Sequence, residues 1–251
     1  MPASPQQPDY AAQFPYPRRR GIRFVLKQGI RLGLAVLCKL RIEGKENLPA
    51  GGPLLVVGNH FHFLDPPALI RALPWPMEFF SGRLLPYAPL SVKIFPTLWG
   101  AYRVRRGGTS RTAMRAAQAC LQQNGVFCVF PEGGSWASVL RPARPGTAFL
   151  AVQSGAPILP IGLDGFTEVF PAVRRGRRAT ATVRIGKPFG PVRVEGRGEQ
   201  RRLQLEEIGH EIMRHIAELI PPGRRGVFSD DPGIRAAAQE AAVYPFDDLQ
   251  G

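Results

Sequence analysis

Three short apolar runs constrain the fold most strongly, because each has the length of a buried strand and each directly follows a glycine or proline. They span residues 54–57, 126–130 and 158–163 of the 251-residue chain. Continuous apolar runs of this length, bounded by turn residues, are typical of strands buried on both faces of a sheet. The chain is therefore expected to place a sheet at its centre.

Amphipathic helical patterns alternate with these runs, most clearly at residues 109–123, 147–154 and 199–219. Further short strands are predicted at 40–44, 78–80, 102–104 and 179–185. Strands that alternate with helices indicate an α/β domain. We predict a single α/β domain over 41–222, with a mixed, largely parallel sheet flanked by helices.

The N-terminal region divides into two predicted parts. Residues 1–20 are polar and rich in proline and glutamine, which predicts a disordered lead-in. Residues 21–40 are largely apolar but carry too many basic residues for a transmembrane helix. A basic stripe recurs at helical spacing and consists of Arg20, Arg23, Lys27 and Arg31.

This stripe predicts an N-terminal amphipathic helix over 21–40 that lies on an anionic membrane surface. The alternative is a helix packed on its own domain with a solvated charged face. At the other end of the chain, residues 223–251 are polar and are expected to form a loose tail.

The charge balance narrows the class of partner. The formal net charge is +14 and comes mainly from arginine, which favours polyanions such as anionic lipid, nucleic acid or phosphorylated cofactors. Biased codon usage could account for part of this excess. No nucleic-acid recognition motif is apparent, so nucleic acid is not expected as a partner. The three cysteines lie in apolar stretches and suit a reducing compartment, which predicts a peripheral location on the cytoplasmic face of the membrane.

The segment that follows the first apolar run carries the best candidate for chemistry. His60 and Asp65 are five residues apart and follow a predicted strand, at the edge where α/β folds place their sites. A carboxylate can hold the imidazole in one tautomer and leave its other nitrogen free to accept a proton from a hydroxyl. Chance or a helix-capping aspartate would give the same spacing.

A metal site is the competing interpretation of this segment, since His62 lies between His60 and Asp65. The remaining histidines are His210 and His215, whose spacing on a helix turns the two rings apart by about 140°. We therefore expect no metal, and we expect His62 to be a packing or supporting residue.

Three further blocks follow in order and make the His60–Asp65 spacing specific. They are the Gly-to-Arg block at 100–106, Phe-Pro-Glu-Gly at 130–133, and a hydrophobic block with a central proline at 157–161. With these four blocks in order, residues 54–162 resemble the glycerolipid acyltransferase family, in particular the lysophosphatidic acid acyltransferase type.

The resemblance implies a role for each matched residue. His60 would be the general base and Asp65 its orienting partner, while Arg106, Glu132 and Gly133 would shape the acceptor site. Glycines at 133 and 134 would let backbone N–H groups approach an anionic oxygen, so Gly134 joins this set. For Glu132, a simple turn carboxylate is the alternative.

The implied reaction moves a fatty acyl group from acyl-CoA or acyl-carrier protein to a hydroxyl of a lysophospholipid or related lipid acceptor. It needs no cofactor beyond the donor. A catalytically silent lipid-binding protein on the membrane surface is the alternative. Residues 107–111 precede a predicted helix and either cap it or contact phosphates of coenzyme A.

One departure from the family pattern concerns the acceptor. The family often continues Phe-Pro-Glu-Gly with Thr-Arg-Ser, whereas this chain has Gly134-Ser135-Trp136, so the arginine assigned to acceptor phosphate is absent. A carotenoid or glycolipid acceptor becomes reasonable. Alternatively, Arg141 or Arg144 takes the missing arginine's place, and the sequence does not decide between these options.

Overall fold

The computed structural model describes residues 10–82, 93–104, 110–135 and 137–242. Its centre is a seven-stranded sheet with the strand order β1-β7-β6-β2-β5-β3-β4. The strands are β1 (Cys38–Glu43), β2 (Leu54–Gly58), β3 (Met77–Gly82), β4 (Tyr102–Val104), β5 (Val126–Val129), β6 (Ile158–Asp164) and β7 (Ala179–Ile185).

Neighbouring strands run parallel everywhere in this sheet except between β6 and β7, which are antiparallel. The predicted mixed, largely parallel sheet is therefore confirmed. Strand β2 lies between β5 and β6, and every residue in it is buried. The loop that leaves β2 thus starts from the middle of the sheet, where helices and neighbouring strands surround it.

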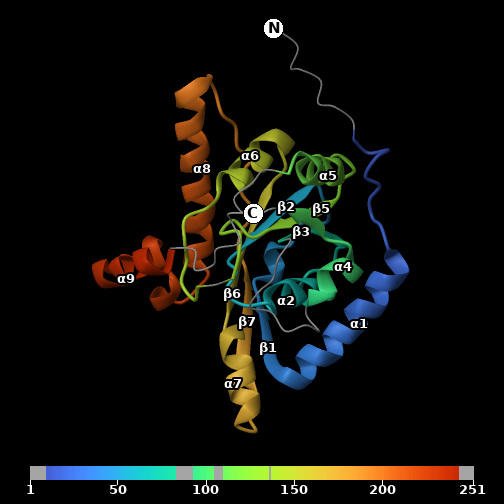
Figure 1. Cartoon of the computed structure of the whole chain (residues 1–251), viewed down its shortest axis with the longest axis vertical. Helices are drawn as coiled ribbons and strands as arrows, with labels where there is room; N and C mark the ends of the chain where they lie inside the picture. Colours follow the sequence, from blue (N-terminus) through green and yellow to red (C-terminus); the bar gives the residue numbers. More distant parts are fainter. Residues whose placement is uncertain (1–9, 83–92, 105–109, 136, 243–251) are drawn as a thin grey trace.

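Helices cover both faces of the sheet, giving three layers (Figure 1). Side chains alternate along β2, so Leu54 and Val56 enter one core while Leu55 and Val57 enter the other. Helices α1, α2, α4 and α7 contribute to the first core, and α5, α6 and α8 to the second. The helices are α1 (Arg20–Leu37), α2 (Asp65–Ala72), α4 (Phe95–Trp99), α5 (Arg111–Gln122), α6 (Pro145–Ser154), α7 (Val169–Arg174), α8 (Gly198–Glu218) and α9 (Pro232–Ala242).

Helix α1 forms where an amphipathic helix was predicted, but its basic stripe does not face outward as a unit. Arg23 is buried and binds Glu78 with both terminal guanidinium nitrogens, at 2.6 and 2.8 Å. Lys27 is half-buried and directed at the carbonyl of Leu73. The prediction that the stripe forms one outward basic face is wrong for Arg23, because this residue faces a carboxylate inside the protein, which a local pattern cannot reveal.

The outward face of α1 is apolar instead. Four aliphatic residues recur at intervals of three, four and seven, which places them along one side of the helix. Each is more than half exposed, and the four are Ile22, Val25, Leu32 and Val36. We call this set the α1 stripe. None of the helices in the described ranges is long and apolar enough to cross a membrane.

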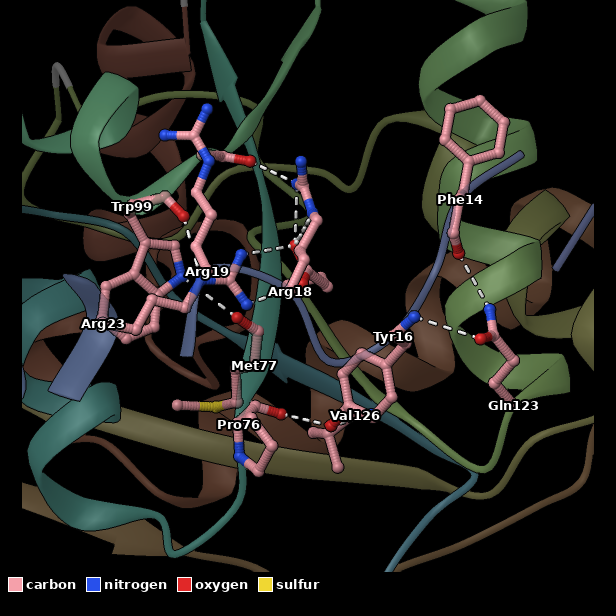
Figure 2. Close-up of polar contacts among 12 residues, drawn as sticks. Phe14, Tyr16, Arg18, Arg19, Arg23, Pro76, Met77, Trp99, Gln123 and Val126 are labelled. Atoms are coloured by element: carbon pink, nitrogen blue, oxygen red, sulfur yellow. Dashed lines mark hydrogen bonds and ion pairs between the residues drawn. The ribbon is translucent and has the colours of Figure 1, made fainter. Parts of the chain in front are cut away.

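From residue 10 onward, the segment before α1 differs from the disordered lead-in that was predicted over 1–20, whose residues 1–9 lie outside the described ranges. From Tyr10 onward it is described, and residues 14–19 run along the domain beside α5 and β3 (Figure 2). The Tyr16 hydroxyl donates to the carbonyl of Pro76 and accepts from the N–H of Val126. The side chain of Gln123 bonds the backbone of both Phe14 and Tyr16. Specific hydrogen bonds therefore hold this segment, although its composition is typical of disorder.

Three arginines at the start of α1 hold the end of helix α4. Arg19 donates to the carbonyls of Thr97 and Leu98, Arg23 donates to that of Trp99, and Arg18 donates to that of Gly100. These carbonyls lie in the last turn of the helix and just beyond it, where helical N–H partners run out, and of the four that of Thr97 also accepts the N–H of Gly100. We call Arg18, Arg19 and Arg23, together with Glu78, the N-terminal clamp.

The C-terminal region also differs from the loose tail that was predicted over 223–251. Helix α9 occupies Pro232–Ala242, and its Ala238 is buried. The carbonyl of Arg224 accepts a hydrogen bond from the N–H of Leu140, at 2.9 Å. Packing and backbone bonding thus order the region as far as Ala242, while residues 243–251 lie outside the described ranges.

Candidate active site

The first functional feature is the turn between β2 and α2, which holds His60 and Asp65. Asp65 is the first residue of α2 and is only 1% exposed. Its Oδ2 lies 3.0 Å from His60 Nδ1 and also accepts the N–H groups of Phe61 and His62, at 2.8 and 2.7 Å. The predicted histidine–aspartate pair is confirmed as a geometric arrangement, and Asp65 also fixes the backbone of the turn.

The pair leaves one imidazole nitrogen available. An ionised carboxylate can only accept hydrogen bonds, so a neutral imidazole paired with it donates through Nδ1 and keeps the lone pair of Nε2 free. The ring stacks on Phe130, with centroids 4.2 Å apart, and its side chain is 17% exposed. His60 is therefore held on two sides while its reactive edge remains accessible.

Glu132 holds the backbone of the same histidine by a hydrogen bond. Its Oε1 accepts the backbone N–H of His60 at 2.8 Å, and its Oε2 accepts that of Arg141 at 3.2 Å. The guanidinium of Arg141 also lies 3.2 Å from Oε2. Glu132 is 2% exposed and both of its oxygens bond protein donors, which favours the turn-carboxylate alternative over direct contact with an acceptor.

Burial dominates the electrostatics of Glu132. Desolvation raises the pKa of its carboxyl from 4.5 to about 7, and the Arg141 guanidinium opposes this rise. The backbone N–H groups of His60 and Arg141 also oppose it. The carboxyl that anchors His60 thus changes its protonation near neutral pH.

A largely apolar cavity of about 820 Å³ opens beside His60. Its wall includes Phe79 and Phe80 from β3, Trp99 from α4, and Met114 from α5. Pockets of this size and character accommodate small molecules with substantial apolar parts. The cavity therefore offers an apolar compartment next to the imidazole.

Of the residues predicted to form the acceptor site, only the two glycines line the cavity among those that the structure describes. Gly133 and Gly134 line the cavity. Gly133 has a φ of +77° and its N–H donates to the carbonyl of Phe130, so this N–H is engaged within the turn. Arg106 lies outside the described residues.

The other three histidines pack against aromatic rings. His62 lies against the rings of Phe63 and Phe170, and burial lowers its pKa. On α8, His215 stacks on Phe189 with centroids 4.1 Å apart, and His210 meets Phe228 edge-on. Within the described ranges, no three histidine, cysteine or acidic side chains gather as metal ligands would.

Two smaller features complete the site. Asn59 is fully buried, and its side chain both donates to and accepts from the backbone of Leu163, at 2.8 and 2.7 Å. It fastens the end of β2 to β6 directly before His60, a role not recognised from the sequence although the residue adjoins the motif. The Ser110 hydroxyl accepts the N–H of Ala113, so the predicted cap of α5 is present.

The sequence matches the Acyltransferase family over residues 39–164. Similar proteins include 1-acyl-sn-glycerol-3-phosphate acyltransferase alpha of Bos taurus, 25% identical over 204 residues that cover 75% of this chain and 66% of that protein. The chloroplastic 1-acyl-sn-glycerol-3-phosphate acyltransferase BAT2 of Brassica napus is 27% identical over 173 residues, covering 67% of this chain and 49% of that protein. The matched region thus spans just under two thirds of the bovine relative and about half of the plant relative.

A solved structure shares the fold. The 1-acyl-sn-glycerophosphate (LPA) acyltransferase PlsC from Thermotoga maritima superimposes with a TM-score of 0.53 and 21% identity, covering 84% of this chain and 86% of that one. The resemblance inferred from the four sequence blocks is confirmed by the family match, which includes the His60–Asp65 turn and Glu132. This chain belongs to the acyltransferase family.

Proposed function

We propose that the protein transfers a fatty acyl group from a thioester donor, acyl-CoA or acyl-carrier protein, to a hydroxyl of a lysophospholipid or related lipid. The observation that carries this proposal is the His60–Asp65 pair beside an apolar cavity in a chain of the acyltransferase family. The relatives are named for 1-acyl-sn-glycerol 3-phosphate, which makes this lipid the first acceptor to test.

The proposed chemistry uses the free nitrogen of His60. Nε2 accepts the proton of the acceptor hydroxyl as its oxygen attacks the thioester carbonyl carbon. The C–S bond then breaks, and the departing thiolate takes the proton back from Nε2. Asp65 stabilises the intervening imidazolium and keeps Nδ1 protonated. The new bond is an ester, and the free thiol of the carrier is released.

A panel of substrates tests this function directly. Purified protein and Asp65→Asn would be incubated with radiolabelled palmitoyl-CoA or palmitoyl-acyl-carrier protein, each with 1-acyl-glycerol 3-phosphate, a glycolipid or glycerol 3-phosphate. We expect a labelled ester product from the wild type and a loss of about 10²- to 10⁴-fold in Asp65→Asn. Absence of product from every pair would contradict the proposal and favour a lipid-binding protein without catalysis.

We also infer that α1 rests on the membrane surface through the α1 stripe. Its four aliphatic side chains are exposed on the protein and would be buried among lipid chains, and Arg20 and Arg31 on the same helix are also exposed. The proposed location is peripheral, on the cytoplasmic face, which suits the three buried free thiols.

Binding to vesicles tests this orientation with a matched pair of leucines. Leu32 is 68% exposed on α1, and Leu203 is 53% exposed on α8. Leu32→Ser should weaken binding to phosphatidylglycerol–phosphatidylcholine vesicles by about tenfold, whereas Leu203→Ser should leave it unchanged. Equal binding by both variants would contradict the proposed contact.

A further inference from the structure

The departure at Ser135 leaves open which group recognises the acceptor. The family pattern implies an arginine there, and this chain has two downstream arginines that could serve instead, Arg141 and Arg144. Arg141 is 3% exposed, lies against Glu132, and donates to the carbonyl of Gly134. Its side chain bonds within the turn at residues 130–134 and does not line the cavity, so it is not placed to bind a ligand there.

Arg144 occupies a different position. It is the residue before α6, and its backbone N–H donates to the carbonyl of Pro131 at 2.8 Å. Its side chain lies across Gly133, since a Cβ added there would come within 2.7 Å of the Arg144 Nε. Gly133 thus leaves the space that the Arg144 side chain occupies, and the bond to Pro131 ties Arg144 to the turn whose Phe130 and Glu132 contact His60.

The Arg144 side chain is also accessible to a ligand in the cavity. It lines the cavity together with His60 and Gly133, and it is half-buried. Within the described ranges its guanidinium has no hydrogen bond or ion pair. A half-buried guanidinium next to an apolar cavity favours an anionic ligand, which can bond two of its N–H groups at once.

The charged groups that line the cavity also favour an anionic ligand. Three arginines line it, Arg144 together with Arg111 and Arg115 from α5, and none of its described lining residues is acidic. The N-terminal turn of the ten-residue helix α6 also faces it through Gly146 and Thr147 and adds partial positive charge. An amphiphile with an apolar chain and an anionic head matches this combination.

We propose that Arg144 binds the anionic headgroup of the lipid acceptor and thereby makes the enzyme selective for acceptors with a phosphate over neutral ones. This inference rests on the proposed function, because it assigns Arg144 to the acceptor of that reaction. Arg144 would take the role of the arginine that is missing at position 135. The departure in sequence then changes which residue holds the headgroup and leaves its charge requirement intact.

Equilibrium binding tests the proposal independently of turnover. The dissociation constants of radiolabelled 1-acyl-glycerol 3-phosphate, neutral monoacylglycerol and coenzyme A would be measured for the wild type, Arg144→Ala and Arg144→Lys. Arg144→Ala should weaken binding of the phosphate lipid by about 10- to 100-fold and leave the neutral lipid within about twofold. Arg144→Lys should recover part of the loss, since a point charge replaces the bidentate fork.

Arg175→Ala is the matched control, because Arg175 is an exposed arginine at the end of α7. It should bind all three ligands as the wild type does. Equal losses for the phosphate and neutral lipids in Arg144→Ala would show a merely structural role and overturn the proposal. A loss confined to coenzyme A would assign Arg144 to the donor and overturn it as well. Failure of the proposed function is seen separately, as wild-type protein that binds the lipid but forms no ester.

Discussion

Two buried carboxylates, Glu78 and Glu132, contact arginine side chains in two parts of the molecule, and their structural roles differ. Glu78 is 1% exposed and binds Arg18 and Arg23, which precede it by 60 and 55 residues. Glu132 is 2% exposed, lies against Arg141 nine residues later, and also accepts the N–H of His60. The first joins distant segments of the chain, whereas the second shapes the turn beside the candidate base.

The comparison shows that a buried arginine–carboxylate contact can belong to the scaffold or to the site. The N-terminal clamp fixes α1 to the end of α4, whose Trp99 lines the cavity wall. Glu132 instead fixes the backbone of His60 itself. Removing Glu78 should therefore affect stability first, while changes at Glu132 should affect the environment of the imidazole.

The largest expected effect on stability comes from breaking the clamp. Glu78→Ala leaves the guanidinium of Arg23, a residue only 5% exposed, without its carboxylate. Removing one partner of such a buried pair costs about 3–5 kcal/mol of unfolding free energy. Urea denaturation measures the loss, and turnover per folded molecule should change far less than stability does. A loss below about 1 kcal/mol would mean that the clamp is not needed for the fold.

The second prediction concerns the pH dependence set by Glu132. Its pKa is about 7 in the folded protein and 4.5 in its ordinary state, so the folded protein holds more protons between these values. The stability linked to this group is therefore fully present below pH 4.5 and is lost as the pH rises toward 7 and beyond. The unfolding free energy of the wild type relative to Glu132→Gln should fall by up to about 3 kcal/mol across this window.

Chemical denaturation at a series of pH values provides the measurement, and Glu207→Gln is the control. The hydrogen bond from Arg214 lowers the pKa of the exposed Glu207, so its linked stability should be lost as the pH falls. The difference in unfolding free energy between the wild type and Glu132→Gln should therefore depend on pH. A difference that does not change with pH, or that rises with pH, would contradict the buried environment assigned to Glu132.

The smallest effect is expected where an arginine–carboxylate pair lies at the surface. Glu43 and Arg184 are 2.9 Å apart, but their side chains are 50% and 35% exposed. Solvent screens this pair, so Glu43→Ala should reduce the unfolding free energy by no more than about 1 kcal/mol. The same urea denaturation measures it. A loss as large as that of Glu78→Ala would show that burial does not explain the difference between these pairs.

Much of the fold was predictable because its signals are local. The apolar runs that form β2, β5 and β6 lie at the predicted positions, and the amphipathic pattern at 199–219 forms α8. The His60–Asp65 pair was predictable for the same reason, since a single turn joins the two residues.

The clamp was not predictable, because no local pattern links Arg18 or Arg23 to a carboxylate more than 50 residues away. The outward position expected for Arg23 in the basic stripe of α1 was wrong for this reason. The choice between Arg141 and Arg144 was open in the sequence, since both follow the same turn. Only packing shows that Arg141 lies against Glu132 while Arg144 lines the cavity.

The central claim is that His60 acts as the base in acyl transfer, and its neighbour His62 supplies the matched control. Initial rates of ester formation from radiolabelled palmitoyl-CoA and the best acceptor would be measured for the wild type, His60→Ala and His62→Ala, with folding of each verified by circular dichroism. We predict a loss of about 10²- to 10⁴-fold for folded His60→Ala and a loss of less than about tenfold for His62→Ala. Wild-type turnover by folded His60→Ala would contradict the account.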